Sequence, residues 1–110
     1  MLKGMASEQA AADYLRARGL QLLARNYRCR GGEIDLILRD GAGIVFVEVR
    51  ERASGNFGGA LSSITAAKQA RIRLAAQHYL VRHNIDAPCR FDAVLIQGGR
   101  LEWLRAVMGA

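Results

Sequence analysis

Two apolar segments separated by a short glycine-containing turn constrain this sequence more than any other feature. Residues 33–39 (EIDLILR) and 44–50 (IVFVEVR) are rich in β-branched and large apolar side chains, and residues 40–43 (DGAG) lie between them. A turn with glycine available for positive φ, flanked by such segments, predicts a β-hairpin. Both strands are apolar on both faces, so we expect the sheet to be covered on both sides.

The register of this hairpin determines which acidic side chains meet. If the turn is centred in the middle of DGAG, paired positions sum to 83, which places Asp35 opposite Glu48 and Glu33 opposite Arg50. Two carboxylates opposed in a buried hairpin repel unless positive charge lies between them. A bound divalent cation and a salt bridge to Arg50 both meet this requirement. A shift of one residue in the register would remove the argument.

The rest of the pattern places helices and further strands around the hairpin. We expect a helix at 6–18, an edge strand at 20–27, a long helix at 62–83, a strand at 90–97 and a short closing strand at 101–104. Ser7 is the expected N-cap of the first helix, with Gly19 following its end, and Ser62 or Ser63 caps the second. Residues 53–61 are glycine-rich and predict a surface loop near the acids. The order α-β-β-β-α-β, with a short final β, predicts a mixed sheet with one parallel pair.

One charged residue in each helix lies on the apolar face. Glu8 precedes Ala11 and Ala12 by three and four residues, so it faces the core side. The alternative is that Glu8 is an ordinary acid in the first turn, which the helix dipole stabilises. Lys68 lies on the apolar line of the long helix, where it either extends past the core to solvent or directs its ammonium at the acids.

Net charge is the compositional feature that bears on function. The 110 residues carry 16 basic and 10 acidic side chains, and 14 of the basic ones are arginine. Residues 31–60 hold five acidic and three basic groups, whereas the flanking segments hold thirteen basic and five acidic ones. An acidic centre between basic ends suits a nuclease, in which carboxylates hold a divalent cation and arginines bind phosphates. A soluble protein that is merely basic is the alternative.

The sequence argues against several other classes. No apolar run approaches the ~20 residues that span a bilayer, and no signal-peptide core follows the first residues, so we expect a cytoplasmic protein. Cys29 and Cys89 form no metal-binding spacing, and His78 and His83 are five residues apart. A zinc site is therefore not expected, and both thiols are expected to be idle.

The motifs GGEIDLI, VFVEVRER, AAKQARI and RFDAV, together with SEQAAADYLRARGLQLLARNYR near the start, carry a resemblance. Over nearly the whole chain the sequence resembles the YraN-like family of small bacterial proteins. That family is similar in fold to restriction-endonuclease-like nucleases, including archaeal Holliday-junction resolvases. The resemblance implies a single endonuclease-like domain over residues 1–110, of the α/β (α+β) class, with helices on both faces of a mixed sheet.

The resemblance also implies a set of site residues. The nuclease motif is an acid at a strand start, then Glu-x-Lys on the next strand, with a further acid on the first helix. Carried onto matching positions, Asp35 and Glu48 are metal ligands, the Val49 carbonyl is a backbone ligand, and Glu8 is the helix acid. The sequence departs from the motif at Arg50, which stands where the motif has lysine. Arginine stays charged and cannot act as a base, but it can stabilise a negatively charged transition state.

The implied activity is hydrolysis of DNA phosphodiester bonds with Mg²⁺ or Mn²⁺, because hard oxygen ligands favour these ions over zinc. Branched or damaged DNA is the expected substrate class. Arg50 and Lys68 would stabilise developing negative charge, and Glu33 is either a further ligand or the partner of Arg50. The arginines expected to bind backbone phosphates are Arg25, Arg28, Arg30, Arg52 and Arg71.

Two other functions are alternatives to the nuclease hypothesis. A nucleic-acid-binding adaptor that kept the nuclease fold would bind DNA without cleaving it. A protein-interaction module using a sheet edge would show no salt-sensitive DNA binding. Junction resolvases of this fold act as dimers, so a homodimer is expected by analogy alone, since no residue pattern fixes an interface.

Overall fold

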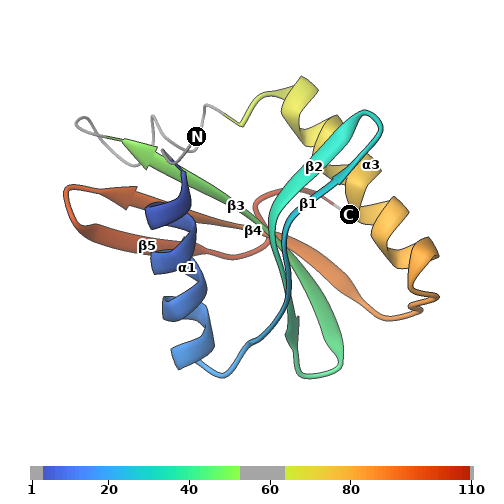
Figure 1. Cartoon of the computed structure of the whole chain (residues 1–110), viewed down its shortest axis with the longest axis horizontal. Helices are drawn as coiled ribbons and strands as arrows, with labels where there is room; N and C mark the ends of the chain where they lie inside the picture. Colours follow the sequence, from blue (N-terminus) through green and yellow to red (C-terminus); the bar gives the residue numbers. More distant parts are fainter. Residues whose placement is uncertain (1–3, 53–63, 110) are drawn as a thin grey trace.

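The computed structural model of the chain describes residues 4–52 and 64–109 (Figure 1). In these residues a five-stranded mixed sheet has the strand order β1-β2-β3-β4-β5, and two helices pack on it. The elements are α1 (Met5–Ala17), β1 (Gln21–Cys29), β2 (Gly32–Asp40), β3 (Gly43–Arg52), α3 (Ala66–Arg82), β4 (Cys89–Gln97) and β5 (Arg100–Leu104). The expected element order and the mixed α and β class are confirmed. Within the described residues, neither helix combines the length and apolar character needed to cross a membrane.

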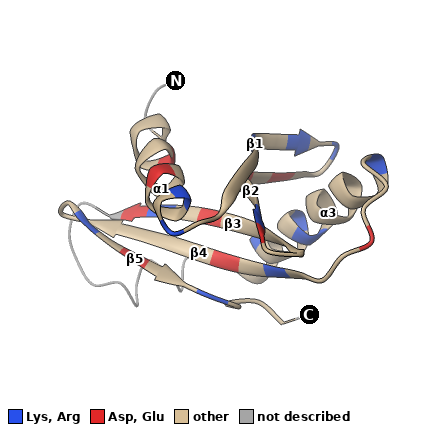
Figure 2. Ribbon diagram, turned by 90° about the horizontal axis from the view of Figure 1, so that it is seen from below, with Lys and Arg blue, Asp and Glu red and all other residues tan. Residues whose placement is uncertain are grey.

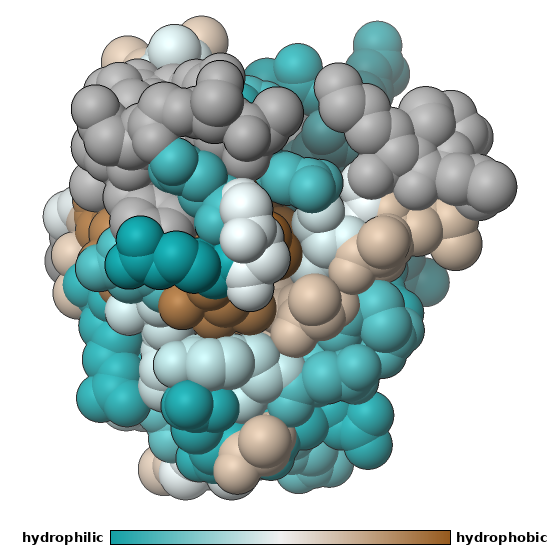
Figure 3. All heavy atoms as spheres, turned by 90° about the vertical axis from the view of Figure 1, so that its left-hand side faces the viewer, coloured by the Kyte–Doolittle hydropathy of each residue, from teal (hydrophilic) through white to brown (hydrophobic). Residues whose placement is uncertain are grey.

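The two helices bury the two faces of the sheet in separate clusters, as the apolar strands predict (Figures 1 and 2). On one face α1 contributes Ala11, Ala12 and Leu15 to a cluster with Leu36, Leu38, Val45 and Val47. On the other face α3 contributes Ile72, Ala75, Ala76 and Tyr79 to a cluster with Ile37, Phe46 and Phe91. On the side of the molecule shown in Figure 3, hydrophilic residues dominate and strongly hydrophobic colour is confined to a small area.

The β2–β3 hairpin has the expected register. Ile37 pairs with Phe46 and Asp40 pairs with Gly43 across a turn in which Gly41 has φ +61°. The antiparallel ladder ends at Leu36 and Val47, whereas β3 continues in parallel pairing with β4 as far as Arg52. The second half of β3 therefore has β4 on one side and an edge without a ladder partner on the other.

The expected N-cap of α1 is wrong. Gly4 occupies the N-cap position without a side-chain hydrogen bond, and α1 begins at Met5. Ser7 lies inside the first turn, where it is buried and donates its hydroxyl to the Glu51 carboxylate on β3. This tertiary hydrogen bond occupies the hydroxyl that a local cap would use. At the other end, Gly19 has φ +95° just after the helix, as expected.

The second helix also begins later than expected. Thr65 is the N-cap of α3, and its hydroxyl accepts the backbone N–H of Lys68 at 3.2 Å. The cap expected at Ser62 or Ser63, like the loop expected at residues 53–61, lies outside the described residues. The helix therefore starts at Ala66, and Lys68 lies in its first turn.

Asp92 holds the C-terminal segment against the sheet. Its side chain is fully buried and accepts hydrogen bonds from Arg90 Nε at 3.1 Å, Trp103 Nε1 at 3.0 Å and the Ala106 N–H at 2.9 Å. A buried carboxylate is stable only with such donors around it. The acid in the RFDAV motif therefore has a structural role, and Arg90 links it to Asp40 at the end of β2.

Candidate functional site

Asp35 lies where β2 separates from β3. Ile34 packs in the α3 cluster and Leu36 in the α1 cluster, although residues two apart on a regular strand share a face. The strand therefore twists sharply at Asp35. The side chain of Asp35 reaches β3, and its Oδ2 accepts the backbone N–H of Val49 at 2.8 Å. A carboxylate thus occupies the place that a β2 carbonyl would have in a continued ladder.

Three carboxyl groups meet at this point. The carboxyl group of Asp35 lies close enough to that of Glu48 on β3 and to that of Glu8 on α1 for their charges to affect one another. Glu8 is half-buried, and the nearby Asn26 side chain lowers its pKa in opposition to burial. Figure 2 shows acidic positions on α1, β2 and β3, the three elements that supply these groups. The structure therefore brings together the three acids expected from the sequence.

The environment of this cluster raises the pKa of two of its carboxyl groups, those of Asp35 and Glu8. Burial, together with the negative charge of Glu48, raises the pKa of Asp35 to about 7, against the opposing effect of the Val49 N–H. Burial and then the charge of Asp35 raise the pKa of Glu8 as well. Like charges forced together in a partly buried site favour the neutral form of one member. Asp35 is therefore only partly ionised near neutral pH.

Arg50 contacts the cluster through Glu48. Its Nη1 donates to Glu48 Oε2 at 3.2 Å, and the two side chains are 26% and 12% exposed. This is the salt bridge that the sequence offered as the alternative to a cation. The pKa of Asp35 is nevertheless raised, because burial and the charge of Glu48 act on it despite this salt bridge.

A hollow of about 460 Å³ opens over these residues. Its lining includes five acids, Glu8, Glu33, Asp35, Glu48 and Glu51, and two cations, Arg50 and Lys68. A smaller hollow of about 40 Å³ shares Glu33, Glu48 and Lys68 with it and adds Arg71. Lys68 thus faces the acids from α3. A larger hollow, about 750 Å³, lies between α1 and β1, but its only acid is Asp13, so its chemistry is much poorer.

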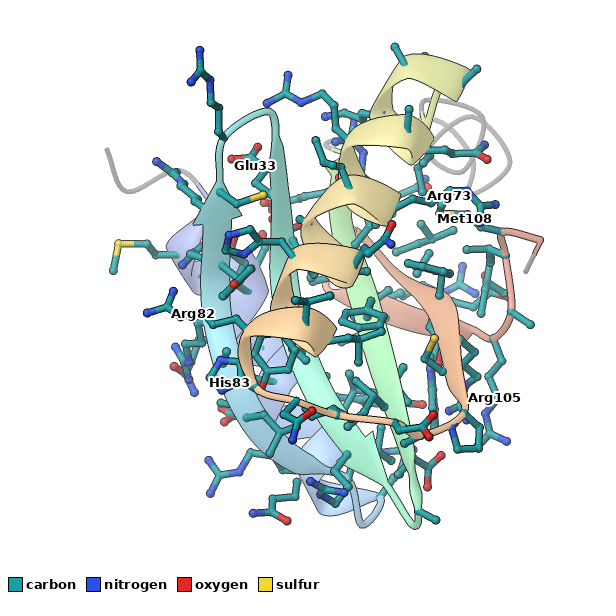
Figure 4. The ribbon with its side chains drawn as sticks, turned by 90° about the vertical axis from the view of Figure 1, so that its right-hand side faces the viewer. Glu33, Arg73, Arg82, His83, Arg105 and Met108 are labelled. Atoms are coloured by element: carbon teal, nitrogen blue, oxygen red, sulfur yellow. The ribbon has the colours of Figure 1, made fainter. Side chains whose placement is uncertain are left out.

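Glu33 lies beyond the end of the β2–β3 ladder, so the strands do not place it opposite Arg50. It forms an ion pair with Arg28 at 3.5 Å, in which both side chains are well exposed. Such an exposed pair contributes little to stability and can open for another partner. In Figure 4, Glu33 lies close to the turn of the β1–β2 hairpin.

The arginines expected to bind phosphate lie at different places. Arg25 is close enough to Glu8 for its charge to lower the pKa of that acid, which partly offsets the effect of burial. Arg71 borders the smaller hollow, and Arg30 is exposed beyond the end of β1. The side chain of Arg52 lies outside the described residues.

Sequence reasoning missed Glu51 and Ser7, which line the hollow together. The signal was available for Glu51, because it lies two residues from Val49 and so shares its face of β3. Ser7 was assigned to a helix cap instead. Within the described residues, no group of three His, Cys, Asp or Glu side chains is already set around one point for a metal ion. A metal would therefore rest on fewer protein ligands.

Comparisons with known proteins match this chain along most of its length. The family model described as "Uncharacterised protein family UPF0102" matches residues 7–96. A UPF0102 protein of Nitrosomonas europaea is 58% identical over 106 residues, covering 94% of this chain and 90% of that protein. A UPF0102 protein of Dechloromonas aromatica is 56% identical over 108 residues, covering 98% and 89%. One of Paracidovorax citrulli is 59% identical over 111 residues, covering 97% and 82%.

Proposed function

Because the chain belongs to the uncharacterised protein family UPF0102, which confirms the expected family, its function is argued from its site, and we propose a nuclease. The proposed reaction is Mg²⁺- or Mn²⁺-dependent hydrolysis of DNA phosphodiester bonds in the bacterial cytoplasm. The observation that carries the proposal is the carboxyl cluster, in which the pKa of Asp35 rises to about 7 between Glu48 and Glu8. Perturbed carboxyl groups converging in a hollow are typical of functional sites.

The donor set fits a magnesium ion. Mg²⁺ is usually held by one or two carboxylates, with waters and substrate phosphate completing its coordination. Asp35 and Glu48 supply two carboxylates, and the Val49 carbonyl points to the same side of β3 as its N–H, toward Asp35. Glu8 would act from outside this pair. When bound, such an ion supplies an activated water and polarises the scissile phosphate.

The basic residues supply the remaining parts of the proposed mechanism. Lys68 and Arg50 line the hollow with the acids, so both can stabilise the charge that develops on a phosphate bound there. Arg50 holds Glu48 in place and carries a permanent charge. The surrounding arginines Arg25, Arg28, Arg30 and Arg71 would bind neighbouring phosphates, and the same role for Arg52 stays a prediction. Branched or damaged DNA as the substrate and a homodimer also stay predictions.

A non-catalytic adaptor is the second candidate function. It is favoured by the contact between Arg50 and Glu48, because an arginine already bonded to the ligand carboxylate replaces the lysine of the nuclease motif. In that case the same basic surface would bind DNA, and the acids would serve no chemical purpose.

A cleavage assay separates the two functions. Labelled linear duplex, single-stranded and four-way-junction DNA are incubated with the protein and millimolar Mg²⁺ or Mn²⁺. We expect the wild type to cleave, Asp35→Asn and Glu48→Gln to lose cleavage, and Asp13→Asn to keep it, since Asp13 is an exposed acid on α1. Salt-sensitive binding without cleavage would support the adaptor, and absence of both would contradict both functions.

Metal binding gives a readout that does not depend on turnover. Calorimetric titration with Mn²⁺ should show binding by the wild type that Asp35→Asn and Glu48→Gln weaken and Asp13→Asn leaves unchanged. Lack of Mn²⁺ binding at millimolar concentration, with and without DNA, would contradict the assignment of Asp35 and Glu48 as ligands.

A further inference from the structure

An apolar seam runs along the outward face of α3, apart from the candidate site. Its positions alternate at spacings of three and four residues and are all exposed; Ala67, Ala70, Leu74 and Val81 are apolar, and Gln77 is a polar residue within the row. Leu74 is 48% exposed and Val81 is 74% exposed. Alternating spacings of three and four residues are the pattern of a coiled-coil contact face. The residues with which α3 packs on the sheet form a different stripe, so burial against the sheet does not account for the seam.

The seam contains a groove of about 560 Å³. Two rows of side chains at spacings of four residues border it: Leu74, His78 and Arg82 on one side, and Gln77 and Val81 on the other. Grooves between such rows are the places into which the side-chain ridge of another helix packs. The shape of the groove therefore favours a helix as its occupant.

The charge around the groove selects the kind of helix. α3 has four basic residues and no acidic one. Arg71, Arg73 and His78 hold the positions that flank a coiled-coil face, where opposite charges on the partner set the pairing. Figure 4 shows Arg73 and Arg82 on opposite sides of α3. The complementary occupant is a helix that carries Glu or Asp beside its apolar stripe.

Two other occupants fit less well. A second copy of α3 would offer no acidic side chain to pair with Arg71 or Arg73, and basic groups brought together across such an interface oppose association. DNA phosphates would meet the apolar side chains of Leu74 and Val81, which border the groove and favour an apolar partner.

We propose that the α3 seam docks an acidic amphipathic helix of another protein. The apolar stripe of that helix covers Leu74 and Val81, and its acids lie against Arg71, Arg73 and Arg82. The apolar contact is separate from the acidic hollow, because neither Leu74 nor Val81 lines it, whereas Arg71 borders both the seam and the smaller hollow. The interaction would bring the catalytic or DNA-binding domain to a larger assembly.

A synthetic peptide of three heptads tests the proposal. It carries leucine and isoleucine at the contact positions, glutamate at the flanking positions and a fluorescent label. We expect micromolar binding to the full chain by fluorescence anisotropy, with a gain of peptide helicity in circular dichroism. A peptide with lysine in place of glutamate, and one with serine in place of the apolar residues, should bind at least tenfold more weakly. Equal binding of either peptide would overturn the proposal.

Val81→Lys separates an apolar dock from charge attraction alone. The substitution removes apolar area and adds positive charge, so a seam of the proposed kind should lose at least tenfold in affinity. Attraction by charge alone would instead leave the affinity unchanged or raise it, which would overturn the proposal. Met5→Lys is the matched control, because Met5 is an exposed apolar residue on α1 and its substitution should leave binding unchanged. Displacement of the peptide by duplex DNA, with DNA affinity altered by Leu74→Gln, would assign the seam to nucleic acid.

Discussion

The backbone N–H of Val49 donates to Oδ2 of Asp35 across 2.8 Å, just beyond the last paired residues of β2 and β3. The contact satisfies a backbone donor at an edge that has lost its ladder partner. It also fixes the carboxyl group of Asp35 beside that of Glu48. The fold therefore holds two acids together by a backbone contact that does not depend on a bound ion.

The stability of the protein should fall as the pH rises from about 4 toward 7. The pKa of Asp35 is about 7 in the folded chain, against 3.8 for an ordinary aspartate, so in this range the folded state keeps a proton that the unfolded chain releases. The stabilisation is complete below the unfolded value and is lost as the pH approaches 7. The raised pKa of Glu8 acts in the same direction. We expect a melting temperature several degrees lower at pH about 8 than at pH about 5, by circular dichroism.

Asp35→Asn checks the assignment of this pH dependence, because asparagine stays neutral at both values. Its melting temperature should change less between the two pH values than that of the wild type, whereas Asp13→Asn should keep the wild-type slope. Added Mn²⁺ should raise the melting temperature of the wild type at the higher pH and leave that of Asp35→Asn unchanged. Identical slopes for wild type and Asp35→Asn would mean that another group dominates.

The hairpin could be predicted from sequence because its information is local. A glycine turn between two apolar segments fixes the register, and Ile37 does pair with Phe46 as that register requires. The register predicts only in part that Asp35 meets Glu48, because the β2–β3 ladder ends at the pair Leu36 and Val47, one pair before these acids. The twist at Asp35 that brings its carboxyl group to Val49 depends on packing against both helices, which no local pattern records.

The helix boundaries likewise divide into those that local sequence predicts and those that distant contacts decide. Gly19 ends α1 where its conformational freedom predicts an end. Ser7 was expected at a cap because its type and position suit one, but a distant acid, Glu51, takes its hydroxyl. A hydrogen bond between residues far apart in sequence is invisible to propensity, and for the same reason the place of Glu51 in the hollow was missed.

Asp92→Asn should destabilise the fold strongly. An amide has one acceptor oxygen where the carboxylate has two, and it would set an N–H₂ group against the donors of Arg90, Trp103 and Ala106. We expect a loss of roughly 2 to 3 kcal/mol in the free energy of unfolding, measured by urea denaturation followed through Trp103 fluorescence. Glu102→Gln neutralises an exposed acid on β5 and should stay within about 0.5 kcal/mol of the wild type. Equal stability of the two variants would show that the buried hydrogen bonds of Asp92 are dispensable.

Gly32→Ala should destabilise the contact between β2 and α3. A Cβ at Gly32 would lie 2.4 Å from the backbone oxygen of Arg71 and 3.0 Å from the backbone nitrogen of Ala75, so the helix would have to move. Overpacking of this kind costs about 1 to 3 kcal/mol, which urea denaturation would detect. Gly109→Ala is the control, because nothing lies within 4 Å of its added Cβ. A Gly32→Ala variant with wild-type stability would show that α3 can shift freely on the sheet.

Lys68 should be the cation on which cleavage depends most. It lines both hollows with Glu33 and Glu48, whereas Arg50 is already bonded to Glu48. Removing a group that stabilises transition-state charge lowers kcat about a hundredfold, so we expect that loss in Lys68→Ala under saturating DNA. Lys68→Arg should recover part of the rate, because it restores the positive charge but replaces the compact ammonium group of lysine by a larger planar guanidinium.

Two further variants decide where the positive charge acts. Arg50→Lys supplies the lysine of the nuclease motif and should cleave at least as fast as the wild type, and Arg16→Ala, which removes an exposed charge at the end of α1, should leave kcat unchanged. If Lys68→Ala cleaves at the wild-type rate while Arg50→Ala does not cleave, the arginine itself carries the role of the motif lysine. If both single variants cleave normally, neither cation stabilises the transition state, and the acids with their metal would account for the whole rate.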